Sequence, residues 1–187
     1  MKNSIIKLGL ASTVLLGSAA GLVHPAEAHA ATQAMTPYYQ WKGYTGYSAS
    51  YVLDKNFVNA VKYGNVTING MKVDAKAVVT EADLLNSVKA EKMFEKNKTA
   101  SKYVATQFDT FALKTGKGAV YFMEIPVQQN KVSMKEVTKA YGKASEVLYG
   151  SNKGQTETAY TVTAKNGVHT TFYFDNKNML TKIQFMN

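Results

Sequence analysis

The sequence of 187 residues contains no cysteine, three prolines and three histidines. Without cysteine the chain forms no disulfide, so its fold depends on packing alone. Cysteine-based zinc sites are excluded for the same reason, and one histidine, His169, follows residue 30. A lone histidine in the alternating stretch "VHTTFYF" is typical of a structural residue, so we expect neither a metal site nor a catalytic histidine.

Arginine is also absent. All 22 basic residues are lysines, and the 13 acidic residues leave a net charge of +9. Lysine is a compact, hydrated point charge and lacks the planar fork with which arginine reads guanine. The composition therefore favours attraction to polyanions without readout of a base sequence. The alternative is that the charge serves solubility, or loose association with an anionic cell wall.

Recognisable catalytic and cofactor motifs are missing as well. Neither the phosphate loop G-x-x-x-x-G-K-[ST] nor the dinucleotide motif G-x-G-x-x-G occurs. The stretch "GYSAS" at 46–50 lacks the last glycine of a nucleophile elbow, and "KTG" at 114–116 suits an ordinary turn. A carboxylate pair could still form among the acids, which keeps a hydrolase as an alternative. We interpret the protein as a non-enzyme with no cofactor.

The first thirty residues have the order of a secretory signal peptide. A basic start, "MKNSIIK", precedes the apolar run "LGLASTVLLGSAAGLV" and a region that ends in small residues. We place the cleavage after Ala30, with Ala28 as the second choice. Residues 31–187 then form one domain of 187 − 30 = 157 residues with 20 lysines and 12 acids, a charge of +8. We expect this domain to be secreted, extracellular or loosely attached to the cell surface, without a membrane anchor.

Three helices are predicted from their capping signals. The first begins after Asp54 and ends at Gly64; the second, at 80–98, begins with the Thr80–Asp83 capping box. The third has a Ser133–Glu136 capping box and ends at Gly142. The predicted buried side of the second helix consists of Leu84, Leu85, Val88 and Met93.

Strands and turns fill the rest of the chain. Asn69-Gly70 predicts a hairpin over 66–73, and Gly116 and Gly118 predict a turn between two strands in 101–128. Asn166-Gly167 and the turn at 175–178 divide 156–185 into a three-strand meander. The prediction is an α+β fold, an antiparallel sheet with about three helices on one face. Residues 80–125 and 133–186 share an order of elements, so a pseudo-repeat is possible.

A row of lysines accompanies the third predicted helix, at every fourth residue: Lys131, Lys135, Lys139 and Lys143. Like charges four apart on a helix cost a few tenths of a kcal/mol per pair. Some of this cost is offset, because Glu136 can reach Lys139 and because cations suit the end of a helix. The row is either a binding surface for polyanions or an ordinary solvated helix face. A second cluster, between Lys89 and Lys102, is interrupted by glutamates and is the weaker candidate.

Residues 36–51 carry six aromatic rings and one charge, Lys42. In a strand these rings would point to both sides, so some should be accessible. We expect the stretch to be partly buried, with Tyr38, Trp41 or Tyr44 as the exposed rings that could stack on nucleic-acid bases beside the lysines. The alternatives are packing into an edge of the core, or a protein-binding surface.

Two stretches resemble the immunodominant staphylococcal antigen B family. They are "TPYYQWKGYTGYSASYVLDKNFVNAVKYGNVTINGMKV" (36–73) and "SMKEVTKAYGK" (133–143), whereas residues 74–118 resemble the family least. The resemblance implies a secreted or surface-associated antigen that binds extracellular nucleic acid without sequence preference. It implies no residue-level binding site, so the seven site residues are our own inference: Lys131, Lys135, Lys139, Lys143, Tyr38, Trp41 and Tyr44.

Overall fold

The structure is a computed structural model that describes residues 39–152 and 155–187. Residues 39–187 form one compact unit. The predicted signal peptide, residues 1–30, and Tyr38 lie outside the described residues. The helices are α1 (Lys55–Tyr63), α2 (Glu81–Asn97) and α3 (Met134–Tyr141). The strands are β1 (Trp41–Gly43), β2 (Val66–Ile68), β3 (Val104–Gln107), β4 (Thr110–Lys114), β5 (Val120–Pro126), β6 (Glu146–Asn152), β7 (Gln155–Thr163), β8 (His169–Phe174) and β9 (Leu180–Met186).

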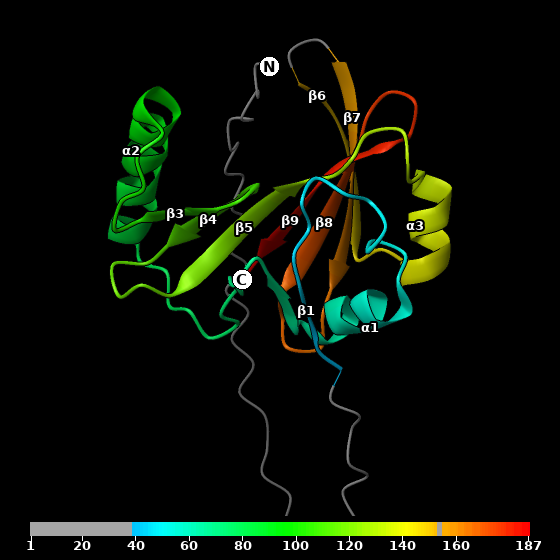
Figure 1. The fold of residues 1–187 in the computed structure, drawn as a ribbon, viewed down its shortest axis with the longest axis horizontal. Coiled ribbons are helices and arrows are strands. Elements are labelled where there is room, and N and C mark those ends of the chain that lie inside the picture. The colour runs from blue at the N-terminus through cyan, green and yellow to red at the C-terminus, as the bar shows by residue number, and fades with distance from the viewer. Residues whose placement is uncertain (1–38, 153–154) are drawn as a thin grey trace, which may run out of the picture. The chain divides into compact units, whose positions relative to one another are not determined.

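Seven of these strands form one sheet in the order β3-β4-β5-β9-β8-β7-β6 (Figure 1). Every neighbouring pair in this sheet is antiparallel. The other two strands form a small parallel pair, in which Trp41 of β1 lies opposite Val66 of β2. The predicted α+β class is confirmed, as is the C-terminal meander of β7, β8 and β9.

The main core lies between one face of the sheet and the helices α1 and α3. In β8 the side chain of Phe172 points into this core, and its neighbour Tyr173 points to the other face. Tyr141 of α3 contacts Phe172 with ring centroids 4.5 Å apart, and Phe57 of α1 is fully buried in the same core. Because both helices cover this face, their exposed sides lie on the same side of the domain.

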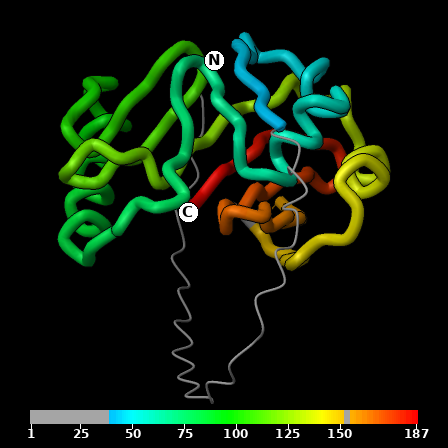
Figure 2. The backbone as a smooth tube through the Cα atoms, turned by 90° about the horizontal axis from the view of Figure 1, so that it is seen from below, coloured from blue at the N-terminus to red at the C-terminus, as the bar shows by residue number. Residues whose placement is uncertain are grey.

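Helix α2 packs on the opposite face, so the prediction that all helices cover one face is wrong. Ala112 of β4 belongs to the main core, and its neighbour Phe111 therefore points to the other side. There it contacts Phe94 of α2, with ring centroids 5.6 Å apart. Figure 2 shows α2, in green, at the end of the fold away from α1. The two blocks that suggested a pseudo-repeat thus share an order of elements but not an arrangement in space.

The predicted helix ends are confirmed by their capping contacts. The Asp54 side chain accepts hydrogen bonds from two backbone N–H groups of the first turn of α1, and Gly64 ends this helix. Both capping boxes form, at Thr80–Asp83 and at Ser133–Glu136. Gly142 follows the last turn of α3.

The buried side of α2 was only partly predicted. Leu84 and Val88 are half-buried as expected, but Leu85 is 57% exposed and Met93 is 65% exposed. The fully buried positions are occupied by small residues, Ser87 and Ala90. Small side chains allow the α2 backbone to lie close to the sheet. The spacing of the larger apolar residues alone therefore did not identify the buried side of α2.

Two strand predictions also need correction. Asn69-Gly70 forms the expected tight turn, with reciprocal 2.8 Å hydrogen bonds between Ile68 and Met71. The pairing of Ile68 with Met71 is an isolated bridge, and the residues after it do not continue as a second hairpin strand. Strand β2 pairs with β1 instead. Residues 101–128 contain three strands rather than two, since the chain also turns at Phe108 and Asp109. That turn has neither glycine nor proline, and Phe108 adopts a φ of +54°.

Strand β6 was not predicted at all. Its described side chains from Glu146 to Ser151 are exposed on both sides of the strand. The alternation of buried and exposed residues, which identifies half-buried strands, is therefore missing. The turns at Asn166-Gly167 and 175–178, which connect the meander, occur as predicted.

Candidate polyanion-binding surface

The four predicted lysines are all exposed, but they do not form one helical row. Lys135 and Lys139 lie four residues apart within α3, whereas Lys131 precedes the helix and Lys143 follows it. The predicted contact between Glu136 and Lys139 does not form. The Glu136 carboxylate accepts hydrogen bonds from the backbone N–H and the hydroxyl of Ser133, at 2.8 and 2.7 Å. These hydrogen bonds lower the pKa of Glu136 and hold its side chain at the start of the helix.

The C-terminal ends of α1 and α3 lie side by side. Lys62, in the last turn of α1, donates a hydrogen bond from Nζ to the carbonyl oxygen of Ala140 in α3, at 3.1 Å. Lys139 stands one residue earlier, in the last turn of α3. Free carbonyl groups give a helix C-terminus a negative partial charge, which stabilises both lysines at this position.

A third segment, the turn after β7, adds Lys165 to the same place. The backbone N–H of Lys165 donates to the carbonyl of Lys62 at 3.0 Å. Its Nζ donates to the hydroxyl of Tyr63 at 3.0 Å and lies 4.3 Å from the centroid of that ring. Tyr39 packs on Tyr63 with ring centroids 5.0 Å apart. We call Lys62, Lys135, Lys139, Lys143 and Lys165 the basic face.

Among the residues that the structure describes, no acidic side chain lies at ion-pair distance from a lysine of the basic face. The segments that carry Lys62, Lys139, Lys143 and Lys165, residues 55–73, 137–145 and 158–174, contain no aspartate or glutamate. Glu136, next to Lys135, is held by its hydrogen bonds to Ser133. Among the described residues, the one salt bridge joins Lys182 to Glu124. Sequence reasoning missed Lys62 and Lys165, although the three acid-free segments were visible in the sequence. What the sequence did not reveal was that these segments meet.

The aromatic segment is divided between core and surface. Trp41 is half-buried and packs edge-on against Phe57, with centroids 5.0 Å apart, so it is only partly exposed. Its indole also lies over Gly43, where an added Cβ would come within 2.6 Å of the ring. Tyr44 is exposed as expected, at 75%, and meets Phe108, which is 74% exposed, at a right angle with centroids 5.6 Å apart.

A polar network fixes the backbone beneath the exposed pair. The carboxylate of Asp109 accepts hydrogen bonds from the Thr45 hydroxyl at 2.9 Å and from the backbone N–H of Tyr47 at 2.7 Å. The fully buried amide of Asn69 donates to the same carboxylate at 2.9 Å and to the hydroxyl of Thr110 at 2.8 Å. This network ties the N-terminal segment to the β3–β4 turn, and so positions Tyr44 beside Phe108.

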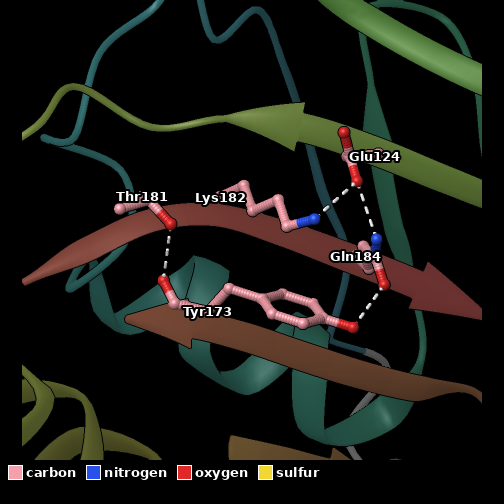
Figure 3. A network of polar contacts seen from close by, with 5 residues as sticks. All are labelled: Glu124, Tyr173, Thr181, Lys182 and Gln184. Carbon is pink, nitrogen blue, oxygen red and sulfur yellow. Dashed lines mark hydrogen bonds and ion pairs between the residues drawn. The ribbon is translucent and has the colours of Figure 1, made fainter. Parts of the chain in front are cut away.

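The face of the sheet away from α1 carries a different kind of polar network (Figure 3). Glu124 accepts hydrogen bonds from Lys182 at 3.1 Å and from Gln184 at 2.7 Å, and Tyr173 donates to Gln184 at 2.7 Å. Burial raises the pKa of Tyr173 to about 12 and also raises the pKa of nearby Glu157. Since two carboxylates face one lysine here, this surface suits a polyanion less well than the basic face does.

Other chemistry has little support in the described part of the chain. His169 is half-buried, and its Nδ1 lies 3.0 Å from the Thr163 hydroxyl. Within residues 39–152 and 155–187, no three His, Asp or Glu side chains converge as metal ligands. The hollow between α1 and the sheet is lined mainly by aliphatic side chains and has room for about one water molecule. None of the described helices is both long and apolar enough to cross a bilayer.

Comparison with known proteins identifies the family. Residues 38–185 match the sequence profile described as immunodominant staphylococcal antigen B. The chain is 32% identical, over 155 residues, to the proteins of that name from Staphylococcus aureus strains USA300 and NCTC 8325, covering 81% of this chain and 76% of theirs. The chain therefore belongs to the immunodominant staphylococcal antigen B family. A DUF4309 family protein, YjgB, from Bacillus subtilis has a solved structure with a TM-score of 0.46 at 12% identity, covering 74% of this chain and 97% of that one.

Proposed function

We propose that this protein acts outside the cell and binds polyanions, chiefly nucleic acid, without sequence preference, through the basic face. Lys131, which precedes α3, is included in the proposed surface. The observation that carries the proposal is the meeting of Lys62, Lys139 and Lys165, from three segments that contain no acid. Unpaired lysines that gather on one surface are the usual electrostatic footprint of phosphate binding.

The lysine chemistry accounts for the lack of sequence preference. Phosphate contacts supply affinity without reading bases, whereas base readout depends mainly on arginine, asparagine and glutamine placed in a groove. In the basic face every cation is a lysine, and none of them is held in the planar, bidentate geometry that reads guanine. Binding should therefore depend on the number of phosphates rather than on their sequence.

Aromatic rings add a preference for single strands. Tyr44 and Phe108 offer exposed ring faces on which unpaired bases can stack, while Trp41 offers only part of its ring. In a duplex the bases already stack on one another, so the rings should contribute little there. The same rings also suit a protein partner, which remains the alternative function.

The test is binding to unrelated DNA sequences over a salt series, with the chain lacking residues 1–30. If four lysines contact phosphates on duplex DNA, log K against log salt should have a slope of about −3.6. The variant Lys135→Glu/Lys139→Glu should reduce the magnitude of this slope by about 1.8. The matched control is Lys92→Glu/Lys96→Glu on α2, an exposed pair with the same spacing and the same charge change.

The outcomes separate local binding from net charge. A loss confined to the α3 variant supports the basic face, and equal losses in both variants contradict it. Tyr44→Ala should weaken single-strand binding more than Trp41→Ala does, with duplex binding unchanged in both. If the protein binds no DNA even at low salt, the nucleic-acid proposal fails, and the exposed rings then favour a protein partner.

A further inference from the structure

Strand β6 forms one edge of the seven-stranded sheet, and among the described strands it pairs with β7 alone. Along an edge strand, alternate backbone N–H and C=O groups point outward without a partner strand. Three consecutive apolar side chains are exposed on β6: Val147 at 38%, Leu148 at 55% and Tyr149 at 76%. An exposed apolar edge of this kind is a template for pairing with another strand.

Most of the usual protection of sheet edges is missing from β6, whose single charge is Glu146 at its first position. The strand has no lysine and no proline, and its register with β7 runs without a bulge from Glu146–Thr161 to Asn152–Gln155. Natural proteins place charges, prolines or bulges on edge strands to prevent association. The opposite edge differs, because β3 has only four residues. The open edge that can accept a strand is therefore β6.

We propose that β6 pairs with β6 of a second copy of this chain, antiparallel, about a two-fold axis at Leu148. In this register Leu148 lies opposite the partner's Leu148, and Val147 lies opposite the partner's Tyr149. Glu146 lies opposite the partner's Gly150. The seven-stranded sheets of the two copies then become one continuous sheet.

The side chains of β6 fit this register. Val147 and Tyr149 share one face of the strand and Leu148 points to the other, so apolar residues meet on both faces. A β-branched residue opposite an aromatic one is a favourable cross-strand pair. The single acidic residue of β6, Glu146, faces a glycine, and the two Glu146 side chains are offset by four residues, about 13 Å. The contact therefore places no like charges opposite each other.

Charge also favours a second copy at this edge. Two copies of a chain with a net charge of +9 repel each other over most of their surface. Residues 144–164 contain two glutamates and one lysine, Lys153, a net charge of −1, so two copies can approach at the β6–β7 hairpin with little repulsion. A two-fold contact closes after two copies and does not propagate into a filament. The contact is small, so the dimer should be weak and dependent on concentration.

The natural absence of cysteine permits a direct test of the register. Facing residues in an antiparallel pair have Cα atoms about 4.5–5.5 Å apart, which is within the range that a disulfide can bridge. Leu148→Cys should therefore form a covalent dimer under mild oxidation about tenfold faster than Glu146→Cys, whose two copies lie about 13 Å apart. Both variants keep a single exposed thiol on the same strand, so they differ only in position.

Light scattering of the unmodified chain, without residues 1–30, provides the second measurement. We expect a monomer–dimer equilibrium that Leu148→Lys shifts to monomer, while Met93→Lys, at an exposed site on α2, leaves it unchanged. If Leu148→Lys fails to fold, the cross-linking rates still decide the question. A monomer at every concentration, or equal linking of the two cysteine variants, overturns the proposal. In that case a peptide strand from another protein is the remaining occupant of the edge.

Discussion

Lys62 and Ala140 join the ends of two helices that lie far apart in the sequence, through a 3.1 Å hydrogen bond from Nζ to the carbonyl oxygen. An ammonium group has three donors, so this contact leaves two N–H groups of Lys62 free for another acceptor. The same lysine can therefore stabilise the α1–α3 contact and bind a phosphate. One side chain thus has a structural role and a role in the proposed phosphate binding.

Replacing Lys62 by glutamine should accordingly have two effects. The lost hydrogen bond should lower the free energy of unfolding by about 1 kcal/mol, or about 3 °C in Tm. The lost phosphate contact should reduce the salt slope of duplex binding by about 0.9. Thermal unfolding and the salt series measure the two effects. Lys55→Gln at the other end of α1 is the control, and a similar loss of both properties there would contradict the role of Lys62.

Asn69 should contribute to the stability of the fold through its side-chain hydrogen bonds as well as through its backbone conformation. It is fully buried, has a φ of +50°, and donates hydrogen bonds to Asp109 and Thr110, with the Thr45 hydroxyl 3.2 Å from the same nitrogen. Asn69→Ala leaves the half-buried carboxylate of Asp109 and two buried hydroxyls without this donor, which costs about 1–3 kcal/mol beyond the backbone strain. Urea denaturation of the variant measures the cost.

Asn130 is the matched control for this experiment. It has a similar φ of +58° but is exposed, so Asn130→Ala reports the backbone strain alone. We expect Asn69→Ala to lower the free energy of unfolding by about 2 kcal/mol more than Asn130→Ala does. Equal costs would mean that the network beneath Tyr44 and Phe108 does not stabilise the fold.

The parts of the fold that could be predicted are those determined by a few neighbouring residues. The cap of Asp54, the capping box at Ser133 and the turn at Asn69-Gly70 each depend on contacts within four residues, and all three occur. The turn at Phe108 has no such signal, because hydrogen bonds to Asp109 from Thr45 and Asn69, both outside the turn, hold the bulky residue at positive φ.

The parts that could not be predicted depend on contacts between distant segments. The apolar side of α2 predicts that the helix packs against the sheet, but it does not predict which face of the sheet. The placement of α2 opposite α1 and α3 was therefore missed. The basic face was missed in part for the same reason. The four-residue spacing identified Lys135 and Lys139, whereas Lys62 and Lys165 join them only through the packing of α1 and the β7–β8 turn.

The stability should depend on pH through Asp83. Its carboxylate accepts a 2.7 Å hydrogen bond from the backbone N–H of Gly116 and a 3.1 Å hydrogen bond from that of Thr80. These bonds, chiefly the one from Gly116, lower the pKa of Asp83 below its usual 3.8. Because the folded state favours the charged form, the stabilisation is complete above the unfolded pKa. It is lost as the pH falls through the lower folded pKa.

The variant Asp83→Asn should therefore be less stable than the natural chain at pH 7, with a difference that shrinks below about pH 4. Urea denaturation at several pH values measures this difference. Glu81→Gln removes a charge from the same first turn of α2, but the Glu81 carboxylate accepts no hydrogen bond from the described residues. A pH-dependent difference of equal size in Glu81→Gln would show that helix-end charge, and not the link to Gly116, is responsible.

Gly64 should couple the stability of the fold to the basic face. It ends α1 with a φ of +68°, and the amide of Asn166 donates a 3.1 Å hydrogen bond to its carbonyl. A Cβ at this position would overlap the Asn166 side chain. Gly64→Ala should therefore cost about 1–2 kcal/mol in backbone strain and also displace the turn that carries Lys165. We expect Gly64→Ala to unfold at a lower urea concentration and to bind duplex DNA more weakly.

Two further variants separate these contributions. Gly167 also has a positive φ, of +92°, but an added Cβ would meet open space. Gly167→Ala should therefore lower the stability through backbone strain and leave the affinity for DNA nearly unchanged. Gly64→Ala/Asn166→Ala removes the overlap and should regain part of the lost stability, while the turn loses its hydrogen bond to α1. If Gly64→Ala binds DNA as tightly as Gly167→Ala, then the position of Lys165 does not matter for binding, and the basic face must be centred on α3 alone.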